Sequence, residues 1–152
     1  MTKRPQVPSK SLVRDAQETI STCAGWASRL AARRITNFLE ERIQDSGLRL
    51  AQMGLMAQIA AAPDDTLGAL AERTGLDQST LSRNLRTLER GGLVEIAAVE
   101  SDLRRRAVWL TETGARRLEA AIPLWRKANA HLAKRLTHLA SGLAKETENL
   151  VL

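Results

Sequence analysis

Apolar residues recur every three or four positions through both ends of the chain, which is the period of an amphipathic helix. The first such stretch, residues 9–44, predicts one long helix with a single buried stripe: Ala16, Ile20, Cys23, Ala27, Leu30, Ile35, Phe38 and Leu39. The pattern returns at about residue 112 and lasts almost to the last residue. There we expect a break near residues 140–142 and a kink at Pro123, whose ring removes a backbone donor.

The middle of the chain has shorter helical stretches and more turn residues. Helices are predicted over residues 49–62, 66–74 and 78–90, the last with Asp77 as its cap. Two strand-like runs follow, residues 93–99 and 106–111, on either side of a polar loop. The sequence therefore predicts a mainly α fold with a small β-hairpin.

Residues 66–90 have the spacing of a helix-turn-helix. Ala71 lets the two helices approach, Gly75 makes the turn, and Leu81 packs the second helix onto the first. The outer face of the second helix should carry hydroxyls and arginines without an acidic residue. Hydroxyls can bond phosphates or base edges, and arginine can bond both acceptors of guanine. The candidate DNA-binding residues of this helix are Ser79, Thr80, Ser82, Arg83, Arg86 and Arg90.

The loop between the two strands is basic. Three consecutive arginines lie at or beside its expected tip, residues 104–106, where a protruding guanidinium can enter the minor groove. We therefore add Arg104 and Arg105 to the candidate DNA contacts. Asp102 is expected to hold a neighbouring arginine through an ion pair and so to steady the hairpin.

The charge and composition of the chain limit the kinds of molecule that it is expected to bind. The chain has 23 Lys and Arg against 17 Asp and Glu, a net charge of +6, which favours double-stranded DNA or another polyanion. Aromatic residues make up only 3%, which argues against single-strand or RNA binding by stacking. The terminal apolar stripes exceed what one small molecule can bury, so we expect a homodimer. Neither a secretory signal nor an apolar run of about 18 residues is present, so we expect a cytoplasmic protein without a membrane partner.

The stretch TLSRNLRTLERGGLV, residues 80–94, resembles the recognition-helix signature of the multiple-antibiotic-resistance regulator (MarR) family. Residues 102–104, followed by VWLTETG at residues 108–114, resemble its wing signature. The resemblance implies a winged helix-turn-helix at residues 46–111 and long helical dimerisation segments at residues 1–45 and 112–152. By the same resemblance, Arg104 corresponds to the minor-groove arginine and Asp102 to the acidic residue that steadies the wing. Leu103 departs from the family pattern, which has a polar or basic residue there.

The resemblance also implies a homodimer that binds pseudo-palindromic promoter DNA, usually as a repressor released by a small ligand or by oxidation. A pocket for a small aromatic or anionic effector would be lined by broad or adaptable apolar side chains, for each of which plain core is the favoured role: Trp26, Met53, Met56 and Trp125. Cys23 is the candidate for oxidation. The peroxide-sensing position of the family falls at Gly25, and the tyrosines of those sensors are absent, so packing on the apolar stripe is the favoured role of Cys23.

Other classes of function have little support. The single cysteine, with His131 and His138 and no matching carboxylates, predicts neither a metal site nor a cofactor. No glycine-rich phosphate loop and no nucleophile with a nearby base are recognisable, so we expect no enzyme. The alternative is a winged helix used only for dimerisation or protein contact. The arginine face argues against it, because protein-contact faces usually carry apolar anchors.

Overall fold

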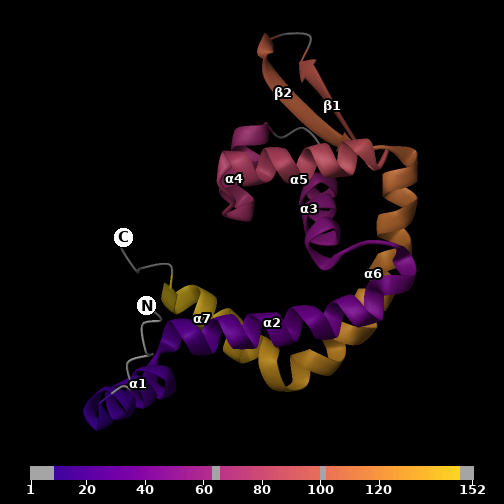
Figure 1. Cartoon of the computed structure of the whole chain (residues 1–152). Helices are drawn as coiled ribbons and strands as arrows, with labels where there is room; N and C mark the ends of the chain where they lie inside the picture. Colours follow the sequence, from indigo (N-terminus) through magenta and orange to yellow (C-terminus); the bar gives the residue numbers. More distant parts are fainter. Residues whose placement is uncertain (1–8, 63–65, 100–101, 148–152) are drawn as a thin grey trace, which may run out of the picture. The chain divides into compact units, whose positions relative to one another are not determined.

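The computed structural model describes residues 9–62, 66–99 and 102–147 (Figure 1). For residues 98, 99, 102–105, 135 and 137 it describes the backbone only. The chain divides into two compact units, Met1–Asn37 and Phe38–Leu152. The elements in order are α1 (Lys10–Thr22), α2 (Ala24–Ile43), the 3-10 turn η1 (Gln44–Ser46), α3 (Leu50–Ala61), α4 (Leu67–Thr74), α5 (Gln78–Arg90), β1 (Val94–Val99), β2 (Asp102–Leu110), α6 (Glu112–Leu132), the π-helical η2 (Ala133–Thr137) and α7 (His138–Thr147).

The first unit contains α1 and most of α2, so the single helix predicted over residues 9–44 is wrong. The two helices are separated at Cys23, whose backbone is extended (φ −72°, ψ 105°). Just before it, the hydroxyls of Thr19, Ser21 and Thr22 donate to carbonyl oxygens three or four residues back, bonds that weaken a helix end. Gly25, a poor helix former, follows. Large apolar side chains of this unit remain exposed: Leu12, Val13, Ile20, Trp26 and Leu30.

The second unit builds its core around the predicted helix-turn-helix. Leu81, Leu85 and Leu88, spaced four and three residues apart on α5, are each at most 3% exposed. They pack with apolar residues of α3, α4, the hairpin and α6: Met53, Leu55, Met56, Ile59, Leu70, Ala71, Val94, Val108, Leu118 and Ala121. Gly75 makes the turn between α4 and α5 with φ +64°, a conformation that glycine adopts without strain. The predicted helix-turn-helix is confirmed.

The hairpin is longer than its apolar pattern indicated. β1 and β2 pair antiparallel, with Val94 opposite Leu110 and Ile96 opposite Val108 (Figure 1). Ala98 pairs with Arg106 and Val99 with Asp102, so residues 103–105 form an irregular bulge within β2. The loop predicted over residues 100–105 is therefore wrong for residues 102–105. Apolar alternation ends at Arg106 because only the base of the hairpin contacts the core, whereas backbone pairing continues beyond it.

The C-terminal helical region is interrupted earlier than predicted. α6 continues through Pro123 to Leu132, and the interruption is the π-helical segment η2. The break expected at residues 140–142 is wrong, because α7 runs through all three positions. One glycine inside a helix costs only about 1 kcal/mol relative to alanine, which is too little to end α7 at Gly142.

Thr111 and Gly114 join the hairpin to α6. The Thr111 hydroxyl donates to the carbonyl oxygen of Gly92 (2.6 Å) and accepts from the backbone N–H of Gly114 (2.9 Å). The first turn of α6 lies so close to Leu93 that a Cβ on Gly114 would sit 2.8 Å from the Leu93 carbonyl carbon. This approach fixes where the hairpin begins relative to α5.

Gly114→Ala should therefore lower the free energy of unfolding by about 1–3 kcal/mol, because rigid backbone would have to move to admit the methyl group. Chemical denaturation of the two proteins measures the difference. The matched control is Gly142→Ala in α7, where nothing lies within 4 Å of the added methyl. The control should leave stability unchanged or raise it, and equal losses for the two variants would contradict the argument.

Candidate nucleic-acid interface

The outer face of α5 is exposed along its whole length. Ser79, Ser82, Arg83, Arg86 and Arg90 are exposed, and Thr80 is half-buried. The inward leucines hold this face outward, because rotating the helix would expose them to water. Among the described residues, no hydrogen bond or ion pair holds the Arg86 guanidinium, so it is free to contact a partner.

Asp77 caps α5 as predicted. Its carboxylate accepts from the backbone N–H of Thr80 (2.9 Å) and from the hydroxyls of Ser79 (2.8 Å) and Thr80 (2.7 Å). These bonds, first the backbone N–H and then the two hydroxyls, hold the pKa of the Asp77 carboxyl well below its usual value. The cap is therefore ionised at neutral pH.

Arg83 folds back over the same turn. Its Nη2 lies 3.4 Å from the Ser79 hydroxyl oxygen and 3.4 Å from that of Thr80, and its Nε donates to the Ser79 carbonyl oxygen at 3.3 Å. The candidate residues at the start of α5 are thus linked to one another through Asp77.

A hollow of about 380 Å³ lies between α5 and the hairpin, and its lining corrects the prediction of a face without acidic residues. Glu89 lines it together with Ser82, Arg86 and Arg106. The sequence analysis placed Arg106 at the start of the second strand, beside the basic loop, and did not select it as a DNA contact. Strand alternation could have found it, because Arg106 shares a face of β2 with the buried Val108 and so faces α5.

The remaining hairpin candidates lie outside the described side chains. The backbone of Asp102, Arg104 and Arg105 belongs to β2, at its bulged end rather than in a loop tip. The ion pair expected of Asp102 and the exposure expected of the two arginines stay predictions.

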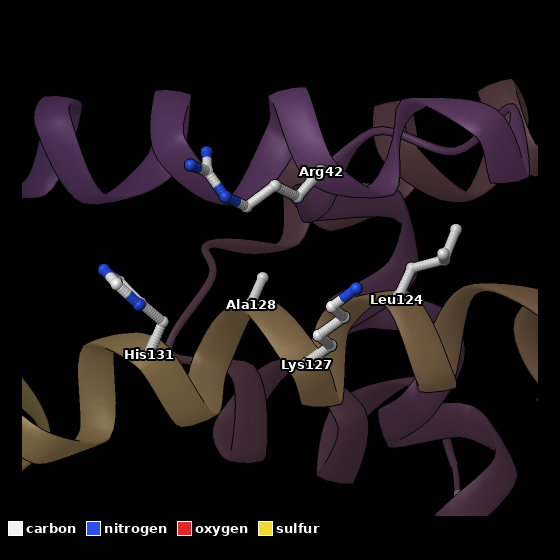
Figure 2. Close-up of a pocket in the computed structure, with 5 residues that line it drawn as sticks. All are labelled: Arg42, Leu124, Lys127, Ala128 and His131. Carbon is white, nitrogen blue, oxygen red and sulfur yellow. The ribbon is translucent and has the colours of Figure 1, made fainter.

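A second hollow, of about 390 Å³, lies between α2 and α6 in the second unit (Figure 2). Figure 2 shows Arg42 on α2 facing the α6 residues that line it: Leu124, Lys127, Ala128 and His131. The Arg42 guanidinium lies 3.4 Å from the centroid of the Phe38 ring, which stacks on His131 at 5.8 Å. Three basic side chains and two small or apolar ones thus surround the hollow, and no carboxylate of the described residues lines it.

Three of the four predicted effector-binding residues belong to one apolar core, and the fourth lies in the other unit. Met53 and Met56 are buried in the core, Trp125 packs partly buried against it, and Trp26 is exposed in the first unit. Cys23 is exposed in the first unit. The prediction that it packs on a buried stripe is therefore wrong within that unit. Within the described residues, no three His, Cys, Asp or Glu side chains are grouped to hold a metal ion. The described helices include none that combines the length and apolarity needed to cross a membrane.

The chain is similar to known proteins both in sequence and in structure. The sequence model described as the MarR family matches residues 46–105. The transcriptional regulator HosA of Escherichia coli O127:H6 is 36% identical over 86 residues, which are 57% of this chain. That match spans 64% of HosA, so the chain covers slightly less than two thirds of this relative.

Solved structures extend the similarity over most of the chain. The M. tuberculosis transcriptional regulator MosR, in complex with DNA, is 31% identical with a TM-score of 0.74, over 86% of this chain and 99% of MosR. A mutant MarR from E. coli, complexed with operator DNA, also has a TM-score of 0.74, over 88% of this chain and 97% of MarR. At 24% identity, the second similarity concerns the fold alone.

Together these similarities confirm the fold class predicted from the sequence, a mainly helical winged helix-turn-helix with a two-stranded wing. HosA and MosR are both named transcriptional regulators, and the family is one of regulators rather than enzymes. The chain belongs to the MarR family.

Proposed function

We propose that the protein is a homodimeric transcriptional regulator that binds duplex DNA through α5 and the hairpin. The observation that carries the proposal is the exposed arginine and hydroxyl face of α5, which the buried leucines orient toward solvent. The net charge of +6 and the similarity to MosR, which was solved in complex with DNA, support it.

In this proposal α5 enters the major groove, where the guanidinium of Arg86 can bond both acceptors of a guanine. Arg83 and Arg90 would contact phosphates or bases on either side. The hairpin would reach the neighbouring minor groove through Arg104 and Arg105, with Asp102 steadying them. Arg106, which lines the hollow beside Arg86, would contact the backbone between the two grooves.

Exposed apolar residues on the terminal helices support a dimer. Leu139 and Leu143 on α7 are 66% and 53% exposed, and Ile20 and Trp26 in the first unit are more than 60% exposed. Each of the two units thus exposes large apolar side chains, which a partner chain would cover. We therefore propose that residues 1–45 and 112–152 form the dimerisation region and that residues 46–111 bind DNA.

We infer that the protein acts as a repressor and that a small effector releases it. The effector would be an anion with an apolar body, held in the hollow between α2 and α6. Arg42, Lys127 and His131 supply hydrogen-bond donors around it, while Leu124 and Ala128 supply apolar contacts. Stacking of Phe38 between Arg42 and His131 holds two of these donors in place before a ligand arrives.

DNA binding is tested by selecting duplexes from a random library with the full-length protein. We expect two-fold symmetric sites with half-sites about one helical turn apart. Arg86→Ala should weaken binding to the selected duplex by about 1–3 kcal/mol and relax the preference at one base pair. Arg126→Ala, which removes an exposed arginine from α6, is the control and should change affinity little.

The salt dependence separates DNA binding from the alternative, a module that contacts only proteins. The logarithm of affinity should fall with that of salt concentration, with a slope of about −0.9 for each phosphate neutralised. If the protein enriches no duplex, or if its affinity for duplex DNA does not change with salt concentration, the protein-contact module is favoured instead.

The dimer is tested by substituting Leu139. A dimer has about twice the 16.7 kDa mass of one chain, and light scattering distinguishes the two. Leu139→Glu should shift the protein to the smaller mass, because each copy loses roughly 1.5–3 kcal/mol of apolar burial and gains a charge to desolvate. Lys145→Glu on the same helix changes the charge more without removing an apolar side chain, so it should leave the mass unchanged. A wild-type protein that remains a monomer at high concentration would overturn the proposal.

The effector pocket is tested by calorimetry with benzoate and with neutral benzamide as probes. Benzoate should bind and benzamide should bind more weakly, because only benzoate forms charge-assisted bonds, worth about 1.5–3 kcal/mol each. Lys127→Gln should weaken benzoate binding, whereas Lys134→Gln, outside the hollow, should not. Equal affinities for the two probes would contradict an anion site.

A further inference from the structure

We propose that Asp77 is a positioning residue for DNA recognition: through the hydroxyls of Ser79 and Thr80 it holds the Arg83 guanidinium in place on the first turn of α5. The proposal rests on the proposed DNA binding. It assigns the two hydroxyls a different task from the one the sequence indicated, because they link Asp77 to Arg83 instead of donating to DNA.

The directions of the hydrogen bonds follow from counting protons. A hydroxyl has one proton, and an ionised carboxylate only accepts. The hydroxyl oxygens of Ser79 and Thr80 lie 2.8 and 2.7 Å from the carboxylate oxygens of Asp77. Each hydroxyl therefore donates its one hydrogen bond to the carboxylate. Their remaining lone pairs point to donors, and Nη2 of Arg83 lies 3.4 Å from both.

This arrangement decides which groups of the first turn can meet a phosphate or a base. A hydroxyl whose proton is on a carboxylate cannot donate to a phosphate oxygen as well. Arg83 has five N–H donors, and those of Nε and Nη2 are directed to the turn, where Nη2 contacts both hydroxyls. The two N–H groups of Nη1 remain for DNA, on a guanidinium that loses less freedom on binding because it is already held.

The role differs from helix capping, and one substitution separates the two. Asparagine caps helices about as well as aspartate, so Asp77→Asn keeps an acceptor for the backbone N–H of Thr80. It replaces one carboxylate oxygen with an NH₂ donor, which can no longer accept from a hydroxyl. Because the Thr80 N–H and the Ser79 hydroxyl both donate to Oδ1, that oxygen keeps the cap and the Ser79 bond, whereas the Thr80 hydroxyl loses its acceptor at Oδ2. The cap therefore survives while one of the two links to Arg83 is broken.

The test is a pair of double-mutant cycles on the duplex selected by the full-length protein. Asp77→Asn should weaken binding roughly threefold or more while the melting temperature changes little. The loss should disappear in an Arg83→Gln background, because the held guanidinium is already gone. It should persist in an Arg86→Gln background, the matched control, because Arg86 is not linked to Asp77 in the described structure.

Each outcome bears on the proposal. Equal losses in the wild-type and Arg83→Gln backgrounds, or a loss that disappears in both arginine variants, would overturn it and leave Asp77 as a cap alone. If Asp77→Asn lowers the melting temperature strongly, Ser79→Ala removes one link without touching the cap and is taken through the same cycles. If the wild-type protein binds no duplex, the proposed function and this inference fail together. If it binds one, but the effects of Asp77→Asn and Arg83→Gln on affinity simply add, only this inference fails.

Discussion

Burial of one face of α5 is the constraint on which the rest of the site depends. Leu81, Leu85 and Leu88 are almost completely removed from water, and each such side chain contributes roughly 1.5–3 kcal/mol. Turning the helix by even one residue would expose part of this row, so the rotation of α5 about its axis is set by the core. The polar face is thereby directed outward without any contact of its own. Apolar packing on one side is what presents arginines in a defined order on the other.

The hairpin is positioned by a different kind of contact. Thr111 bonds both the end of the α5–β1 connection and the first turn of α6, and Gly114 allows the backbones to meet. The hairpin therefore begins at a fixed distance from α5, and Arg106 faces the hollow that Arg86 lines. Two elements separated in sequence become one basic surface through a threonine and a glycine that carry no charge.

Much of the fold could be predicted because its signals are local. The helices α3, α4 and α5 follow from apolar spacing, Asp77 and Gly75, and these were confirmed within one or two residues. The division at Cys23 was missed because hydroxyl-to-carbonyl bonds within α1 do not disturb the apolar period. The extent of β2 was missed because backbone pairing needs no apolar side chain. Residue type alone could not decide whether the methionines and tryptophans line a pocket, since such side chains serve a core as readily as a pocket.

Two carboxylates on a surface that is proposed to bind a polyanion need a physical reason. Asp77 lies at the start of α5 and Glu89 near its end, and each repels phosphates. Their presence lowers the sequence-independent part of the attraction, which depends on the number of phosphates neutralised. More of the affinity must then come from base contacts, which are the contacts that distinguish one site from another. A carboxylate that also orients an arginine, as we propose for Asp77, weakens general attraction and sharpens a specific contact at the same time. The acidic residues are therefore consistent with a surface that selects DNA sites rather than one that binds any duplex.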